Sequence, residues 1–168
     1  MRQLIDALSS TGSPKITVVT LVNHIALPNM KTSYDKNDVE FLLRDLSDIN
    51  IEKDTEEREY LIQQGTHYSE MLPVEFHPNE QYMELFYKTL QQYGVSIAIA
   101  VGVVAEKIRQ YKSLDELVLV SLARAGTPIG ILIKRYYEQK YGISVPHYSI
   151  SIIRNRGIDE TALLFILN

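Results

Sequence analysis

The chain has 168 residues, of which 45% are hydrophobic, so it is long enough for one domain with a buried core and short for two. Its 17 basic and 21 acidic residues give a formal net charge of −4, which argues against bulk attraction to nucleic acid or to an anionic membrane. There is no cysteine, which excludes disulfides, thiolate zinc sites and a cysteine nucleophile within these residues.

The hydrophobic pattern predicts neither a secreted nor a membrane protein. Residues 1–15 combine a short apolar run with the acidic Asp6, which makes a poor signal peptide. The best candidate for a membrane span, residues 95–108, is shorter than the roughly 20 apolar residues needed and ends in charge. We therefore expect a cytoplasmic protein without a membrane partner.

The first part of the chain contains one ambiguous pattern and one clear one. Residues 1–30 fit either a strand or a buried helix, because periodicity alone does not separate the two. Residues 33–46 predict a helix, because their aliphatic residues recur at helical spacing. These residues are Val39, Leu42, Leu43 and Leu46.

Three further helices are expected before residue 113. Residues 54–65 begin with an acidic turn and end in glycine, which predicts a helix. Residues 66–79 are typical of a loop. Residues 79–94 predict a long helix that ends at Gly94, and residues 96–112 predict another that is largely buried over its first half.

The pattern changes to strands and helices after residue 116. Residues 117–122 form a continuous apolar run, which predicts a strand covered on both faces. Residues 128–142 predict a helix with proline in its first turn, and residues 143–153 a second strand. Residues 159–168 predict a short terminal helix. The order strand, helix, strand favours a right-handed crossover and a parallel sheet.

The turn after the first of these strands is a candidate anion site. Ligands of parallel sheets bind beyond the carboxyl ends of strands, where loops lead into helix N-termini. Gly126 would let the backbone approach a ligand or adopt positive φ, Arg124 adds a charge with bidentate geometry, and Thr127 offers a hydroxyl. The alternative is an ordinary turn with Arg124 in a surface ion pair, since Arg-x-Gly-Thr is not a specific motif.

A second basic cluster follows the next strand. Arg154 and Arg156 flank Asn155, and Gly157 is a candidate hinge, which suits a loop that closes over a polyphosphate. From Arg109 onward the chain has 8 basic and 5 acidic residues, a balance of +3 in a chain of net −4. The alternative is a solvated basic turn.

Histidines and carboxylates in the loop of residues 66–79 are weaker candidates. Their spacing fits no strict metal-ligand pattern, so a packed, hydrogen-bonded loop is the leading interpretation, with a metal or acceptor site as the alternatives. The residues concerned are His67, Tyr68, Glu70, Glu75 and His77. We expect His147 to be a hydrogen-bonded histidine at the end of a strand rather than a catalyst.

Two long segments, residues 118–137 and 145–163, resemble the phosphoribosyltransferase-like StiP family of bacterial tellurite-resistance and stress-response gene clusters. Upstream stretches "FLLRDL", "IQQGTHYSEMLPVE" and "YMELFYKTL" share the resemblance, which covers the chain from about Ser33 to its end. Some members of this family are called cysteine proteases. Because the chain has no cysteine, that activity cannot reside in these residues.

The resemblance implies an α/β fold, with part of the Rossmann-like parallel sheet of a type I phosphoribosyltransferase. Residues 1–112 would form a helical hood and residues 113–168 the start of the core, within one compact unit. Arg154 and Arg156 would act in the catalytic flexible loop, and Tyr68 and Glu70 would bind the acceptor. The pyrophosphate loop would contain a non-proline cis peptide and consist of Ala123, Arg124, Ala125, Gly126 and Thr127.

The implied activity is transfer of ribosyl phosphate from 5-phosphoribosyl 1-pyrophosphate to a base, in the synthesis of a stress-response ribonucleoside. Magnesium would arrive with this small-molecule substrate rather than occupy a protein metal site. The alternative is a non-catalytic module that binds a nucleotide or a phosphoribosyl ligand as a sensor.

The chain departs from this family pattern at its end. The acidic strand end and the Thr-Gly-rich turn that hold a 5-phosphate are missing, because the sequence stops at "ALLFILN". We therefore expect the N-terminal portion of a longer glycosyltransferase, inactive alone. The family's RNA-binding C-terminal domain is also missing, so no nucleic acid is expected to bind. An uncovered sheet edge is expected to favour a homodimer.

Overall fold

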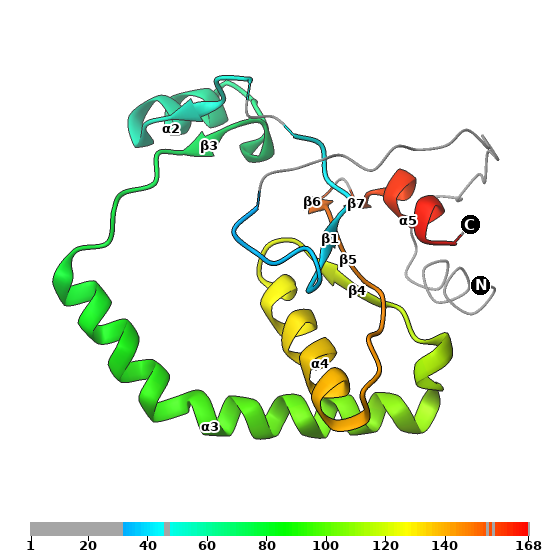
Figure 1. The fold of residues 1–168 in the computed structure, drawn as a ribbon. Helices are drawn as coiled ribbons and strands as arrows, with labels where there is room; N and C mark the ends of the chain where they lie inside the picture. The colour runs from blue at the N-terminus through cyan, green and yellow to red at the C-terminus, as the bar shows by residue number, and fades with distance from the viewer. Residues whose placement is uncertain (1–31, 46–47, 154, 156, 168) are drawn as a thin grey trace. The chain divides into compact units, whose positions relative to one another are not determined.

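The computed structural model describes residues 32–45, 48–153, 155 and 157–167 (Figure 1). These residues form mixed α/β structure in two compact units. Of the residues described, the first unit contains 32–44, 118–131 and 146–167, and the second contains 45–117 and 132–145. The prediction for residues 1–30 lies outside the described residues, and the division into a hood and a core stays a prediction.

A three-stranded parallel sheet organises the first unit. Its order is β1 (Glu40–Phe41), β5 (His147–Ile150) and β4 (Leu119–Leu122), and helix α4 (Gly126–Tyr141) follows β4 in the chain. The predicted order of strand, helix and parallel strand is therefore confirmed. Burial alternates along β4, and Val120 remains 41% exposed, so the expectation that both faces are covered is wrong.

The predicted helix over residues 33–46 is wrong over the residues described there, because strand pairing determines their conformation. Residues Glu40–Phe41 pair with β5, and the amide of Leu42 donates to the carbonyl of Ser149 at 3.0 Å. The Leu42 side chain then packs with Ile150 and Ala162 in a buried cluster. Helical spacing of aliphatic residues is a weak preference, which tertiary contacts override here.

A hairpin and a helix complete the first unit. Strands β6 (Ile152–Ile153) and β7 (Gly157–Ile158) pair antiparallel, so the second predicted strand is divided between β5 and β6. The predicted terminal helix is confirmed as α5 (Glu160–Leu167). The Asp159 carboxylate caps its first turn by accepting a hydrogen bond from the Ala162 amide at 3.1 Å.

The second unit contains a small parallel sheet and a capped helix. Strand β2 (Glu52–Lys53) pairs with β3 (Leu72–Pro73), so the loop predicted over residues 66–79 carries some regular structure. Helix α2 (Thr55–Gln63) confirms the helix predicted for residues 54–65. The Asp54 side chain caps it by accepting from the Glu57 amide at 2.8 Å.

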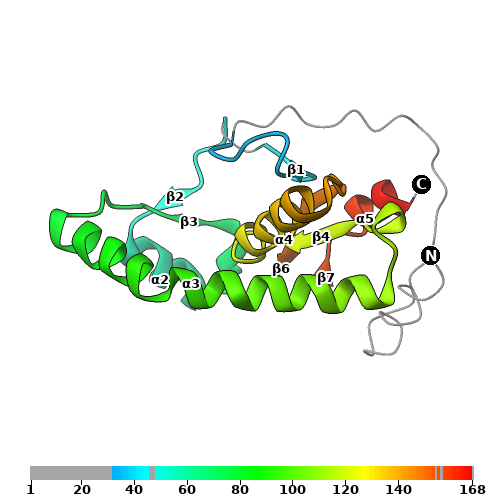
Figure 2. The same cartoon turned by 60° about the horizontal axis from the view of Figure 1, so that its bottom comes forward.

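The two helices predicted on either side of Gly94 form one continuous helix, α3 (Glu80–Tyr111), of 32 residues (Figure 2). Asn79 caps its start by accepting from the Tyr82 amide at 2.9 Å. Gly94 therefore does not end a helix. A glycine inside a helix costs only about 1 kcal/mol relative to alanine, which is too little to interrupt two strong flanking segments. Among the described residues, no helix combines the length and the apolar character needed to cross a membrane.

Candidate functional site

The candidate anion site is the turn between β4 and α4. The amide of Ala123 donates to the carbonyl of Ile150 at 2.8 Å, and the amide of Thr127 donates to the carbonyl of Arg124 at 3.2 Å. The peptide bond between Ala123 and Arg124 is cis, as the resemblance implied. The turn thus stands at the carboxyl end of a parallel strand and leads into a helix N-terminus, the position where α/β proteins bind ligands.

The side chains of this turn divide into an exposed set and a buried anchor. Arg124 and Ala125 are exposed, and Ala123 and Gly126 are partly buried. Thr127 is only 1% exposed, and its hydroxyl lies 2.8 Å from the Ser149 hydroxyl. The Thr127 hydroxyl therefore ties the start of α4 to β5.

Gly126 does not need positive φ. Its φ lies outside the left-handed region, and an added Cβ would meet Ser121 at an ordinary contact distance of 3.8 Å. Neither backbone conformation nor packing therefore requires glycine at this position.

The other predicted site residues lie elsewhere. Arg154 and Arg156 lie outside the described residues. Gly157, the predicted hinge beside them, has φ of 94°, a conformation that favours glycine. Tyr68 and Glu70 are exposed on a 3₁₀ turn of the second unit, and their role in acceptor binding stays a prediction.

A buried serine–histidine pair lies behind the turn. The Ser121 hydroxyl is 2.7 Å from His147 Nε2, and His147 Nδ1 is 2.9 Å from the carbonyl oxygen of Asp38. Because a carbonyl only accepts, Nδ1 carries the proton and donates, so Nε2 accepts from Ser121. This confirms that His147 is a hydrogen-bonded strand-end histidine, whereas Ser121 gave no signal in the sequence.

The pair is built as a structural clamp, although it resembles a nucleophile with its base. Ser121 is 7% exposed and His147 is 3% exposed. Gly130 of α4 lies so close that an added Cβ would overlap both Ser121 Oγ and His147 Nε2. A nucleophile needs space for a reacting atom about 3 Å from its oxygen, and Gly130 occupies that side.

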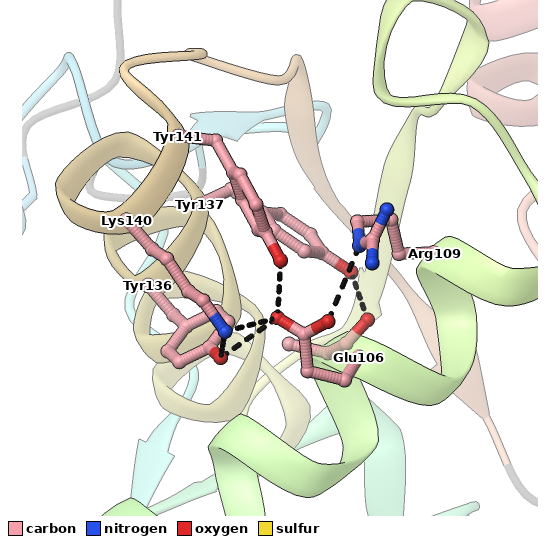
Figure 3. A network of polar contacts seen from close by, with 7 residues as sticks. Glu106, Arg109, Tyr136, Tyr137, Lys140 and Tyr141 are labelled. Carbon is pink, nitrogen blue, oxygen red and sulfur yellow. Dashed lines mark hydrogen bonds and ion pairs between the residues drawn. The ribbon is translucent and has the colours of Figure 1, made fainter.

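A second polar cluster, the Glu106 cluster, joins α3 and α4 within the second unit (Figure 3). The hydroxyls of Tyr136 and Tyr141 donate to Glu106 Oε1 at 2.8 and 2.6 Å. Lys140 Nζ lies 2.8 Å from the same oxygen, and Arg109 Nε lies 3.2 Å from Oε2. Beside them, the buried Tyr137 donates to the carbonyl of Ala105 at 2.7 Å.

These contacts make Glu106 a structural anchor rather than a general base. The hydrogen bonds from Lys140, Tyr141 and Tyr136 hold the pKa of the Glu106 carboxyl well below its usual range. Reciprocally, Glu106 raises the pKa of Lys140 above its usual value. A carboxylate so strongly held in its ionised form does not take up a proton near neutral pH.

We expect the contribution of Glu106 to stability to disappear in acid. A lowered folded pKa means that the contribution is complete above the ordinary glutamate value of about 4.3 and declines as the pH falls below it. The difference in unfolding free energy between the wild type and Glu106→Gln should therefore be constant from pH 6 to about 8 and narrow below about pH 4.3. Urea unfolding across this pH range measures it.

The matched control for this experiment is Glu116→Gln, whose side chain is 70% exposed beside Lys112. It should change stability little at any of these pH values, because exposed ion pairs contribute little. A constant difference for Glu106→Gln down to pH 3, more than one unit below the ordinary glutamate value of about 4.3, would contradict the assignment of an anchoring carboxylate.

Among the described residues, no group of three or more histidine, aspartate and glutamate side chains is placed to hold a metal ion. In particular, the loop of residues 66–79 brings no such group together. Its His67 instead caps the 3₁₀ turn, with Nδ1 accepting from the Ser69 amide at 3.3 Å.

Comparison with known proteins identifies the family. The model of the family described as "Tellurite-like stress resistance cysteine protease StiP" matches residues 32–168. The chain belongs to the StiP family. The cysteine protease StiP of Acinetobacter baylyi (strain ATCC 33305 / BD413 / ADP1) is 41% identical over 138 residues, which cover 80% of this chain and 34% of that protein. The chain thus spans about a third of the length of this StiP relative. No solved structure matches it significantly.

These findings correct the expected activity. StiP membership and the link to tellurite-like stress resistance are confirmed, but the names of the family and of the relative both specify a cysteine protease. The prediction of phosphoribosyl transfer is therefore wrong, and the alternative of a nucleotide or phosphoribosyl sensor is not supported. The structure shows small parallel sheets and helices, and it does not confirm a phosphoribosyltransferase-type Rossmann core.

Proposed function

We propose that this StiP chain binds a phosphate-bearing small anion at the turn of residues 123–127, as one part of a stress-resistance protein. The observation that carries the proposal is the position of Arg124. Its side chain is exposed on the turn that leads from the carboxyl end of β4 into the 16-residue helix α4. A guanidinium and a helix N-terminus at one place favour an anion over a neutral ligand.

The scaffold under the turn supports this proposal. The Ala123 amide is bonded to β5, and the Thr127 hydroxyl is bonded to Ser149 on the same strand. These two hydrogen bonds hold both ends of the turn in place, so the backbone loses little conformational freedom when an anion binds. Preorganised backbone lowers the entropic cost of binding.

Magnesium enters this proposal only with the ligand. The described residues provide no cluster of three carboxylate or histidine ligands for it. Phosphate groups commonly bring Mg²⁺ with most of its water shell and need few protein ligands.

The protease activity in the family name requires a thiol that these residues do not provide. The chain contains no cysteine, and Ser121, the hydrogen-bonded alternative, is closed off by Gly130. We propose that any cysteine-dependent chemistry of a full-length family member uses residues outside this stretch. The small anion would then bind to a part of the protein that is separate from the nucleophile.

Calorimetric titration with magnesium pyrophosphate tests the site. We expect Arg124→Ala to weaken binding at least tenfold, which is about 1.4 kcal/mol, because it removes the bidentate charge. The affinity of Arg124→Lys should lie between those of the wild type and Arg124→Ala, because lysine keeps the charge but lacks the planar guanidinium geometry.

Arg135→Ala is the matched control. Arg135 is exposed as well, but it lies on α4 itself, nine residues beyond the start of that helix at Gly126, or about 14 Å at 1.5 Å per residue. It should bind as the wild type does. Equal losses in Arg124→Ala and Arg135→Ala, or no binding by the folded wild-type chain, would overturn the proposal.

A further inference from the structure

An extended, exposed segment connects β3 to helix α3 within the second unit (Figure 1). It comprises residues 72–78, "LPVEFHP", and every one of them is exposed. After Pro73 the chain belongs to no strand or helix until α3 begins at Glu80. Phe76 is 89% exposed, more than any other large hydrophobic side chain among the described residues. This stretch is called the 72–78 segment below.

Two prolines give the 72–78 segment its extended conformation from its own sequence. Proline disfavours helical geometry in the residue before it, and Leu72 and His77 each precede a proline. Proline also fixes its own φ near about −65° and has no amide to donate, so Pro73 and Pro78 do not continue a helix. The extended shape is therefore a local property of these residues and needs no packing partner.

The backbone around Phe76 is available to another chain. Among the described residues, none forms a hydrogen bond with Phe76 or His77. The strand pairing that precedes them ends at Pro73. Side chains of an extended chain alternate between two sides, so Leu72, Val74 and Phe76 lie on the same side. The segment thus presents open backbone groups and a row of apolar side chains.

We propose that the 72–78 segment is a processing site, cut between Phe76 and His77 by an endopeptidase that accepts an aromatic side chain before the scissile bond. Exposed, irregular stretches are the preferred sites of proteolytic nicking. An extended peptide binds a cleft through backbone hydrogen bonds, and pockets for alternate side chains give specificity. Phe76 fills the pocket beside the reacting carbonyl, and Val74 fills the one two residues earlier. Hydrolysis adds water across the amide, which leaves a carboxylate on Phe76 and an amino group on His77.

Tyr111, which is 87% exposed, shows why exposure alone does not select the bond. It is the last residue of α3, and the amide that follows it, on Lys112, donates to the carbonyl of Ile108 at 3.1 Å. A protease could reach that bond only after the last turn of the helix had unwound. The bond after Phe76 needs no such opening, because the chain on both sides of it is already extended.

Limited digestion of the 168-residue chain with chymotrypsin tests the site, because the specificity pocket of this protease is a hydrophobic slot. Residues 1–31 contain no aromatic residue, so cuts after phenylalanine or tyrosine report on the rest of the chain. We expect the first of these cuts after Phe76, with the fragments identified by mass spectrometry. Phe76→Ala should slow cleavage of this bond at least tenfold. The matched control, Tyr111→Ala, should be cut after Phe76 at the wild-type rate.

The dependence of the cleavage rate on urea shows whether the folded chain is the substrate. If the segment is cut as it stands, the rate after Phe76 should not change with urea below the unfolding transition. A short peptide substrate in the same solutions corrects for the effect of urea on the protease itself. If the chain must unfold first, the rate rises steeply with urea, because it follows the population of the open form.

Three results would overturn the proposal. A first aromatic cut at Tyr111 or within a helix would mean that the 72–78 segment is not the accessible site. Cleavage after Phe76 that rises with urea as the unfolded population does would mean that the folded segment is not a substrate. An unchanged rate and fragment pattern in Phe76→Ala would mean that the aromatic side chain does not direct the cut.

Discussion

Replacing Gly130 with alanine is expected to destabilise the fold, although alanine is the better helix former. An added Cβ at Gly130 would overlap Ser121 Oγ and His147 Nε2, which are buried and bonded to each other. Either α4 moves away from β4 or the serine–histidine bond breaks. Overpacking of this kind costs typically about 1–3 kcal/mol, and urea unfolding at neutral pH measures it.

Gly94→Ala is the matched control for Gly130→Ala. Gly94 also lies inside a helix, but an added Cβ there would meet nothing closer than Leu90 at 4.0 Å. Its replacement should stabilise the protein by up to about 1 kcal/mol through helix propensity alone. If Gly130→Ala were stabilising to the same extent, the tight packing of α4 on the buried pair would be disproved.

Removing the side chain of His147 is expected to have the largest effect on stability. His147→Ala leaves the carbonyl of Asp38 and the hydroxyl of Ser121 without their partner and opens a cavity in the first unit. Unpaired buried polar groups cost about 1–3 kcal/mol each, and the cavity adds to this, so a loss of about 3–5 kcal/mol is expected. Thermal and urea unfolding should both show it.

Two further variants test whether the loss of stability comes from the hydrogen bonds of His147 rather than from the removal of any histidine. His77→Ala, at an exposed position before α3, should change stability by less than about 0.5 kcal/mol. His147→Asn, which retains a donor for the Asp38 carbonyl, should recover part of the loss. A loss below about 1 kcal/mol in His147→Ala would show that the bonds contribute little.

The local pattern of the sequence predicted most of the regular elements. Helices α2, α4 and α5, strand β4 and its parallel pairing with β5 follow from periodicity, capping residues and the handedness of crossovers. Most of these signals lie within a single element, and paired residues of β4 and β5, such as Leu119 and His147, are 28 residues apart in the chain. They can therefore be recognised from the sequence without knowledge of the fold. The same reasoning located the turn that contains Arg124.

Two predicted elements failed where local signals compete with distant ones. Residues 33–46 carry helical spacing, yet Glu40–Phe41 form an edge strand because β5, more than 100 residues away in the chain, supplies the hydrogen bonds. Gly94 resembled a helix end, yet the helix continues because its flanking segments propagate through a single glycine. Whether a segment forms a strand depends on a second strand that pairs with it. The periodicity of the segment itself does not reveal where that second strand is.

The prediction of function was likewise correct in one part, the family, and wrong in another, the activity. Long motifs identified the StiP family, which the comparisons confirm, but the activity drawn from its phosphoribosyltransferase likeness did not hold. A fold-level likeness transfers architecture more safely than chemistry, because chemistry depends on a few side chains. In this chain those side chains include no thiol.

The sequence by itself determined the family, the net charge, the absence of cysteine and the order of the main elements. Tertiary structure alone decided which polar groups meet: Ser121 with His147, Thr127 with Ser149, and Glu106 with Tyr136 and Tyr141. The partners are 22 to 35 residues apart in the chain, and each bond forms only after strands and helices have packed. Buried hydrogen bonds need both groups in place at once, so their pairing is a property of the fold rather than of any local stretch.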